Sequence, residues 1–144
     1  QINEIENIVN GQILINSNID VSVKPFDEAK KEGAVAMFGE KYGEEVRVIT
    51  VSDFSKELCG GTHVDRTGDI GLFKIIEESS LASGVRRIVA LTGQKSVEYF
   101  QNQFSTLESV QSQLNCSKDS IADRLSQLLG QKKYYYLYNR LVSI

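Results

Sequence analysis

The chain has 144 residues, of which 41% are hydrophobic and 24% charged, and its formal net charge is −3. This apolar fraction is too high for a disordered tail, and no stretch approaches the roughly 18 consecutive apolar residues of a membrane span. The acidic excess argues against a protein that binds polyanions over its whole surface. Any contact with nucleic acid is therefore expected to be local.

Two Cys and a single His restrict the metal and redox chemistry of the chain. Cys59 and Cys116 are too far apart for a CxxC pair and too few for a disulfide framework, so we expect a reducing compartment, the cytoplasm. A structural zinc site takes four protein ligands and a catalytic site three. The Cys and His residues of this chain are not expected to complete such a site by themselves.

The start of the chain lacks the basic and apolar regions of a signal peptide and has no initiator Met. We expect a piece cut from a longer protein. Apolar residues at helical spacing predict an amphipathic helix over 2–15. Alternation from Ile19 to Val23 then predicts a half-buried strand, which Pro25 ends because proline cannot donate a ladder hydrogen bond.

A second helix is predicted after that strand. Asp27 is expected to cap it, Phe38 to be its last apolar residue and Gly39 to stop it, with Gly33 as an interruption.

Three further strands are predicted from runs of β-branched residues at 46–50, 70–77 and 87–92. The segment between the first two is Gly-rich and polar, and no strand is predicted in it. Strands outnumber helices without regular alternation, which favours an α+β fold with a sheet layer and a helix layer over residues 1–92.

A change in composition after Gly93 places a domain boundary between residues 92 and 93. Apolar residues lie on one stripe of a helix predicted over 94–114. After a short break, Ser117 is expected to cap a second helix with apolar residues from 121 to 129. Residues 93–144 are therefore predicted to form an antiparallel helical hairpin, a spacer or packing arm rather than a site.

The densest group of reactive side chains is a short segment in which Cys59 and His63 flank Gly60, Gly61 and Thr62. Adjacent glycines disfavour a helix by about 1 kcal/mol each, so a loop is expected. A tightly folded loop would let the thiolate and the imidazole converge on one ion, and would present backbone N–H groups to a substrate oxygen or phosphate. The spacing alone leaves open a metal site, a Cys-His nucleophile and a buried Cys beside a polar loop.

Arg86 and Arg87 form a second candidate site at the start of a predicted strand. Strand alternation sends their side chains to opposite faces, so at most one of them faces a given ligand. A guanidinium that forks onto a phosphate or a base edge and a pair of solvated arginines are both consistent with the pattern. The polar segment at 67–71 is interpreted as a turn rather than a phosphate loop.

Together, LCGGTH at 58–63, TGDIGLF at 67–73 and GVRRI at 84–88 closely resemble the editing domain of bacterial alanyl-tRNA synthetases, and FGEKY at 38–42 fits as well. The resemblance covers residues 1–92 and extends, less specifically, into the helical linker. The related editing domain of threonyl-tRNA synthetases shares the Cys-x-x-x-His pattern, but the Gly-Gly-Thr spacer favours the alanyl type.

The resemblance implies hydrolysis of tRNA-Ala that carries Ser or Gly by mistake. Cys59 and His63 would be two of four zinc ligands, and the other two would come from a His-x-x-x-His motif that is absent here and expected upstream. Thr62, beside the Gly pair, would contact the Ser hydroxyl. Arg86, with Arg87 beside it, would contact the acceptor end of tRNA-Ala.

The resemblance has further implications for the parent protein. ATP and magnesium would serve only its aminoacylation domain, which joins alanine to tRNA-Ala. Any oligomer would form through regions outside this chain, no DNA or membrane partner is expected, and the segment alone is expected to be inactive. The alternatives are a free-standing deacylase that acts in trans and a tRNA-binding or structural module without chemistry.

Overall fold

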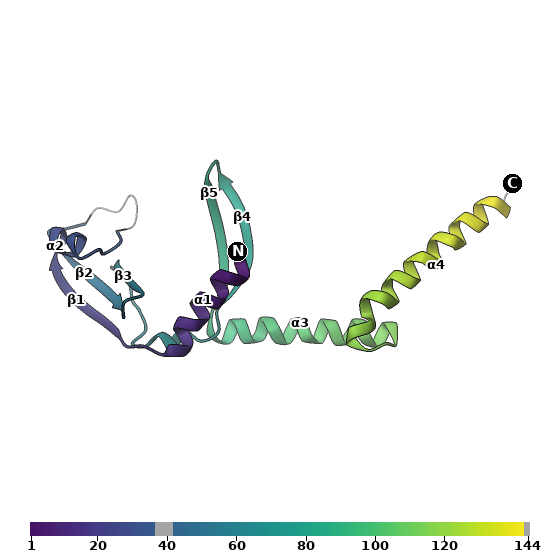
Figure 1. The fold of residues 1–144 in the computed structure, drawn as a ribbon, viewed down its shortest axis with the longest axis horizontal. Coiled ribbons are helices and arrows are strands. Elements are labelled where there is room, and N and C mark those ends of the chain that lie inside the picture. The colour runs from purple at the N-terminus through teal and green to yellow at the C-terminus, as the bar shows by residue number, and fades with distance from the viewer. Residues whose placement is uncertain (37–41, 143–144) are drawn as a thin grey trace. The chain divides into compact units, whose positions relative to one another are not determined.

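The computed structural model describes residues 1–36 and 42–142, with the side chains of residues 136–142 left out of the description. The chain forms two compact units, Gln1–Val97 and Glu98–Ile144 (Figure 1). The first contains two small antiparallel sheets with helices, and the second is helical. This architecture confirms the predicted α+β fold followed by a helical hairpin.

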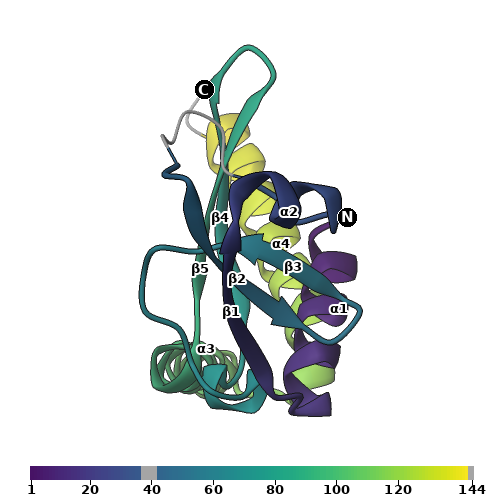
Figure 2. The ribbon, with the colours of Figure 1, turned by 90° about the vertical axis from the view of Figure 1, so that its left-hand side faces the viewer.

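The first sheet has three antiparallel strands, β1 (Ile19–Pro25), β2 (Glu45–Val51) and β3 (Ser55–Leu58), with β2 in the middle (Figure 2). The predicted strands at 19–23 and 46–50 are confirmed, because their β-branched residues alternate with polar ones. The first is not half-buried as predicted, since Val21 is 48% and Val23 65% exposed. β3 lies in the Gly-rich, polar segment for which no strand is predicted. It forms because Ser55 to Leu58 pair with the second half of β2.

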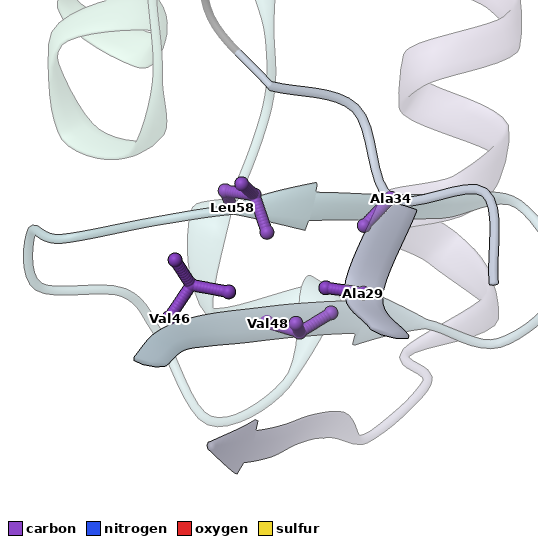
Figure 3. Close-up of a cluster of buried hydrophobic side chains, with 5 residues drawn as sticks. All are labelled: Ala29, Ala34, Val46, Val48 and Leu58. Carbon is purple, nitrogen blue, oxygen red and sulfur yellow. The ribbon is translucent and has the colours of Figure 1, made fainter. Parts of the chain in front are cut away.

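The core of this sheet is small and aliphatic. Val48 in the middle of β2 is only 1% exposed. The buried cluster comprises Ala29, Ala34, Val46, Val48 and Leu58 (Figure 3). Three partly buried side chains, Phe26, Ala36 and Tyr42, pack against this cluster.

The second helix, α2 (Phe26–Lys31), is shorter than predicted. Pro25 occupies the N-cap position and no side chain caps the helix, so the prediction for Asp27 is wrong; Asp27 lies in the first turn, where its charge opposes the helix dipole favourably. Gly33 ends the helix with φ +87°, and Val35 then pairs with Glu57 beside β3. Phe38 and Gly39 fall outside the described residues.

Helix α1 (Ile2–Ile15) is confirmed and ends at Asn16, which adopts the left-handed conformation with φ 57°. It packs against a short 3₁₀ helix, η1 (Thr67–Ile70). The buried Thr67 hydroxyl donates to the Gln12 carbonyl and accepts from the Ser17 amide, both at 2.9 Å. The turn predicted at 67–71 therefore has a structural role.

The second sheet is the hairpin of β4 (Lys74–Ala82) and β5 (Val85–Leu91). The predicted strand at 87–92 is confirmed, but the one at 70–77 begins late. Ile70 completes η1, and Gly71 then takes φ 68° and ψ −167°, a conformation that prevents an extended strand from starting there. The structure places α1 beside β4 (Figure 1), and Glu6 bonds to Lys74 at 2.9 Å.

Two long helices, α3 (Gly93–Leu114) and α4 (Ile121–Val142), follow the second sheet. The 3₁₀ helix η2 (Lys118–Ser120) lies in the turn between them. Ser117 precedes η2 rather than α4, and its hydroxyl bonds to the Ser120 hydroxyl at 2.8 Å, so the prediction that it caps the long helix is wrong. Over residues 1–36 and 42–142, no helix is both long and apolar enough to cross a membrane.

Candidate functional site

The candidate site is the loop of residues 59–64, which follows β3 directly. The Cys59 amide donates to the Arg47 carbonyl at 3.1 Å, so the pairing of β3 with β2 continues for one residue beyond the strand. Past that point the chain leaves the sheet. The prediction that Cys59, the glycines, Thr62 and His63 lie in a loop is confirmed.

Arg47 holds the first half of this loop. Its Nε donates to the carbonyl oxygen of Cys59 at 2.9 Å, and its Nη2 donates to the carbonyl oxygen of Gly61. One guanidinium on β2 therefore contacts two carbonyl groups of the loop, and its planar set of donors suits that arrangement.

The far end of the loop is tied to the segment between α1 and β1. The Ile19 amide donates to the Asp65 carbonyl and the Thr67 amide to the Ser17 carbonyl, both at 2.9 Å. The Arg66 guanidinium reaches the carbonyl oxygen of Asn16 at 2.8 Å. The loop thus spans two fixed ends, one on the first sheet and one at the end of α1.

Cys59 and His63 are both placed on this loop, but no further metal donor joins them within the described chain. Cys59 is half-buried, with its Sγ 4.0 Å from the Gly61 carbonyl. His63 is exposed, and its Nδ1 lies 2.9 Å from the Val64 carbonyl. Residues 1–36 and 42–142 contain no group of three His, Cys, Asp or Glu side chains placed to hold a metal ion. A thiol and an imidazole suit zinc chemically, but they are half of a tetrahedral set.

The two glycines are exposed and unconstrained. A Cβ at Gly60 or Gly61 would meet nothing within 4 Å, and neither backbone is left-handed. The expectation that these glycines allow a tight fold is therefore wrong, because this chain conformation accepts a side chain at either position. What their lack of side chains does provide is open space beside exposed Thr62.

A cavity of about 260 Å³ opens beside the start of the loop. Its wall includes Tyr42, Arg47, Leu58, Cys59 and Gly60. Strand β2, strand β3 and the loop all contribute to it, so a small ligand group in this cavity would contact both Arg47 and the loop.

A larger cavity, of about 620 Å³, lies at the β2–β3 turn and includes none of the predicted site residues. Glu32 on its wall bonds to Lys24 at 2.8 Å and to Lys56 at 3.2 Å. The hydrogen bond from Lys24, followed by that from Lys56, lowers the pKa of the Glu32 carboxyl. These three charged side chains form ion pairs with one another, and the cavity is not part of the candidate site.

Arg86 and Arg87 lie at successive positions of β5, opposite Ser80 and Ser79, so strand geometry turns their side chains to opposite faces as predicted. Both are exposed. The Arg86 guanidinium pairs with the Glu78 carboxylate at 2.7 Å, with side chains 61% and 31% exposed. The two arginines belong to the second sheet and the Cys59 loop to the first.

Arg47 was absent from the predicted site residues. In the sequence it is an ordinary polar position in an alternating strand, with no motif around it. Its loop partners lie 12 and 14 residues further along the chain. Only the antiparallel pairing of β2 with β3 brings them within reach.

The chain is similar in sequence to known proteins. Residues 46–89, from β2 to β5, match the family described as threonyl and alanyl tRNA synthetase second additional domain. The chain is 50% identical over 133 residues to the alanine–tRNA ligase of Fervidobacterium nodosum, and 52% identical over the same length to that of Polaromonas naphthalenivorans. A third such ligase, from Nitrosococcus oceani, is 47% identical over 133 residues.

Each of these matches covers 92% of this chain but only 15% of the relative, so the chain spans a small part of the length of the curated relatives it matches. The matched region contains the whole Cys59 loop, all of β4 and most of β5. Residues 46–89 therefore match the threonyl and alanyl tRNA synthetase second additional domain, and the chain is similar in sequence to a segment of bacterial alanine–tRNA ligases.

Proposed function

We propose that this segment is part of an editing site that hydrolyses tRNA-Ala carrying Ser or Gly, within a cytoplasmic protein that ligates alanine to tRNA-Ala. The observation that carries the proposal is the loop of residues 59–64. It lies inside the family match, is held at both ends and carries a half-buried thiol, an exposed imidazole and two exposed glycines. ATP and magnesium would serve only the aminoacylation region, which lies outside this chain.

The reaction is the hydrolysis of an ester. The oxygen of a water molecule bonds to the acyl carbon, the bond from that carbon to the ribose oxygen breaks, and a proton passes to the ribose oxygen. Negative charge develops on the carbonyl oxygen, and fixed backbone N–H groups stabilise such charge. The exposed loop around Gly60 and Gly61 supplies such groups.

Cys59 and His63 would hold zinc together with two ligands from outside this chain. A zinc ion bound there would supply a Lewis acid. The residues of this chain would bind and orient the substrate, and the open space at Gly60 and Gly61 would admit its acyl end.

Selection of Ser over Ala is the harder demand on this site. A synthetic pocket sized for alanine cannot exclude the smaller glycine by size and rejects an added hydroxyl only modestly, so a second hydrolytic site adds fidelity. That second site must spare Ala and so requires a polar contact to the Ser hydroxyl. Thr62, exposed next to Gly61, is the residue we propose for this contact.

Arg86 is proposed to contact the acceptor end of tRNA, and Arg87 is proposed as a second tRNA contact from the opposite face of β5. Arginine suits phosphate because its forked donors bind two oxygens at once. The Glu78 partner orients the Arg86 side chain and partly offsets its charge, so tRNA would compete with Glu78 for the guanidinium. Any oligomer of the parent protein would form through regions outside this chain.

The test removes each loop donor from the full-length native protein. We expect Cys59→Ala and His63→Ala to lower bound zinc and to slow hydrolysis of Ser-tRNA-Ala by at least about tenfold, because metal affinity depends strongly on its ligand shell. Cys116→Ala is the matched control, since Cys116 lies in the turn after α3. Zinc content per chain and deacylation rate are the measurements.

Equal zinc in the Cys59 and Cys116 variants would refute the ligand role. Hydrolysis by a native protein that cannot aminoacylate tRNA would identify a free-standing deacylase instead. Binding of tRNA without hydrolysis would leave only a binding module.

A further inference from the structure

We propose that Arg47 is a positioning residue that orients the Cys59–His63 loop and turns the N–H groups of Gly60 and Thr62 toward the substrate. The proposal deepens the proposed function, on which its catalytic readout rests. Its structural part concerns only the contacts of Arg47 with the loop.

Two carbonyl groups of the loop accept hydrogen bonds from one guanidinium. The Cys59 and Gly61 oxygens both accept from Arg47, while the Arg47 carbonyl accepts from the Cys59 amide at 3.1 Å. Arg47 therefore contacts the loop through its backbone and its side chain at once. The strand β2 that carries it is central in its sheet, so the anchor is rigid.

The consequence for the loop follows from the planar trans peptide, in which C=O and N–H point in opposite directions. The Cys59 carbonyl shares a peptide plane with the Gly60 N–H, and the Gly61 carbonyl shares one with the Thr62 N–H. With both carbonyls directed to Arg47, both N–H groups point away from it. Within the described residues, neither N–H group has a hydrogen-bond partner.

The open space around Gly60 and Gly61 leaves room for a substrate. No atom of the chain lies within 4 Å of a Cβ built at Gly60 or Gly61. A carbonyl or phosphate oxygen could therefore approach the two N–H groups closely. Fixed donors of this kind stabilise developing negative charge because they need no reorganisation during the reaction.

Arginine is required at this position for a geometric reason. Its guanidinium is a rigid fork that serves two carbonyl oxygens and remains charged at any physiological pH. A lysine ammonium is a compact point charge on a flexible stem and does not reproduce the fork. Arg47→Lys should therefore keep the charge and lose the loop geometry.

The structural test uses the full-length native protein in metal-free form. We expect Arg47→Ala and Arg47→Lys to speed amide hydrogen exchange in residues 59–63, and alkylation of Cys59 by iodoacetamide, by about tenfold, the low end of the effect of supporting contacts on a site. Exchange in β1 should stay unchanged in Arg47→Lys. Arg124→Ala, which removes an exposed arginine from α4, is the control.

The functional test measures hydrolysis of Ser-tRNA-Ala by the same variants. We expect kcat to fall by about 10- to 100-fold because a misplaced reactive group costs that much. KM should stay unchanged because the proposed tRNA contacts, Arg86 and Arg87, lie on the second sheet. Lysine should restore the melting temperature without restoring kcat. A merely structural role would lower kcat only in proportion to the folded fraction.

Unchanged loop exchange and alkylation in both variants would overturn the proposal, as would full recovery of kcat by lysine. If the native protein hydrolyses no Ser-tRNA-Ala, the proposed function fails. The exchange and alkylation rates would still decide whether Arg47 positions the loop.

Discussion

Gly60 and Gly71 present opposite surroundings to an added methyl group. A Cβ at Gly60 meets open space, whereas one at Gly71 would lie 2.8 Å from the Cα of Gly93. Gly71 also takes φ 68° and ψ −167°, which is essentially restricted to glycine. One glycine is thus required by the fold, and the other is free for an incoming ligand.

We expect Gly71→Ala to destabilise the chain by about 1–3 kcal/mol from backbone strain alone. Gly60→Ala should leave the melting temperature unchanged but slow deacylation in the full-length protein by about 10- to 100-fold, because the methyl would displace the substrate. Thermal denaturation and single-turnover deacylation measure the two effects. A Gly60→Ala protein with full activity would show that nothing approaches the loop there.

At the scale of elements, α1 is attached to the start of β4 by polar contacts. The Glu6 carboxylate accepts from Lys74 Nζ at 2.9 Å and from the Ile75 amide at 2.7 Å. The Asn10 side chain accepts from the Phe73 amide and donates to its carbonyl, both at 2.9 Å. These bonds fix α1 against the segment that follows the candidate site.

The contacts of Glu6 predict a dependence of stability on pH. The hydrogen bond from Lys74, aided by that from Ile75 and opposed by burial, lowers the pKa of Glu6 from its ordinary 4.5. The charged form is thus favoured by folding, so its contribution is present above pH 4.5 and is lost as pH falls through the lower folded pKa.

We therefore expect Glu6→Gln to cost about 1–2 kcal/mol at pH 7 and progressively less below pH 4.5. Urea denaturation across that range measures the difference. Glu4→Gln, on the same helix but outside these contacts, is the control. A difference between Glu6→Gln and the native chain that stays constant down to pH 2 would contradict the assignment.

At the scale of the whole molecule, the chain holds two compact units, each with its own contacts. Val48, 1% exposed, lies at the centre of the first sheet's core. Cooperative opening follows such contiguous contacts. A destabilising substitution in this core is therefore expected to increase opening of the first unit only.

Val48→Ala should destabilise the first unit by about 1–2 kcal/mol, the transfer free energy of two methyl groups plus a small cavity. Amide hydrogen exchange should rise in β1, β2 and β3 and stay unchanged in α4. Leu129→Ala, at a residue 60% exposed on α4, is the control. Faster exchange along α4 in Val48→Ala would show that the two units unfold together.

The amino-acid sequence by itself determined the elements with a strong local period. The apolar stripe of α1, the alternation in β1 and β2 and the long stripe of α3 each identify their element, since side-chain spacing and backbone geometry share one period. The loop character of Cys59 to His63 also follows locally, because adjacent glycines disfavour regular structure. The family resemblance rests on the same short motifs.

Features that depend on residues far apart in the chain appear only in the folded structure. β3 exists because β2 offers it a free edge, the chain after α2 pairs through Val35 with Glu57 of β3, and β4 starts late because residues 67–70 form η1 against α1. The role of Arg47 has the same origin. A donor's partner is set by which strands lie side by side, and one residue's type and spacing do not encode that.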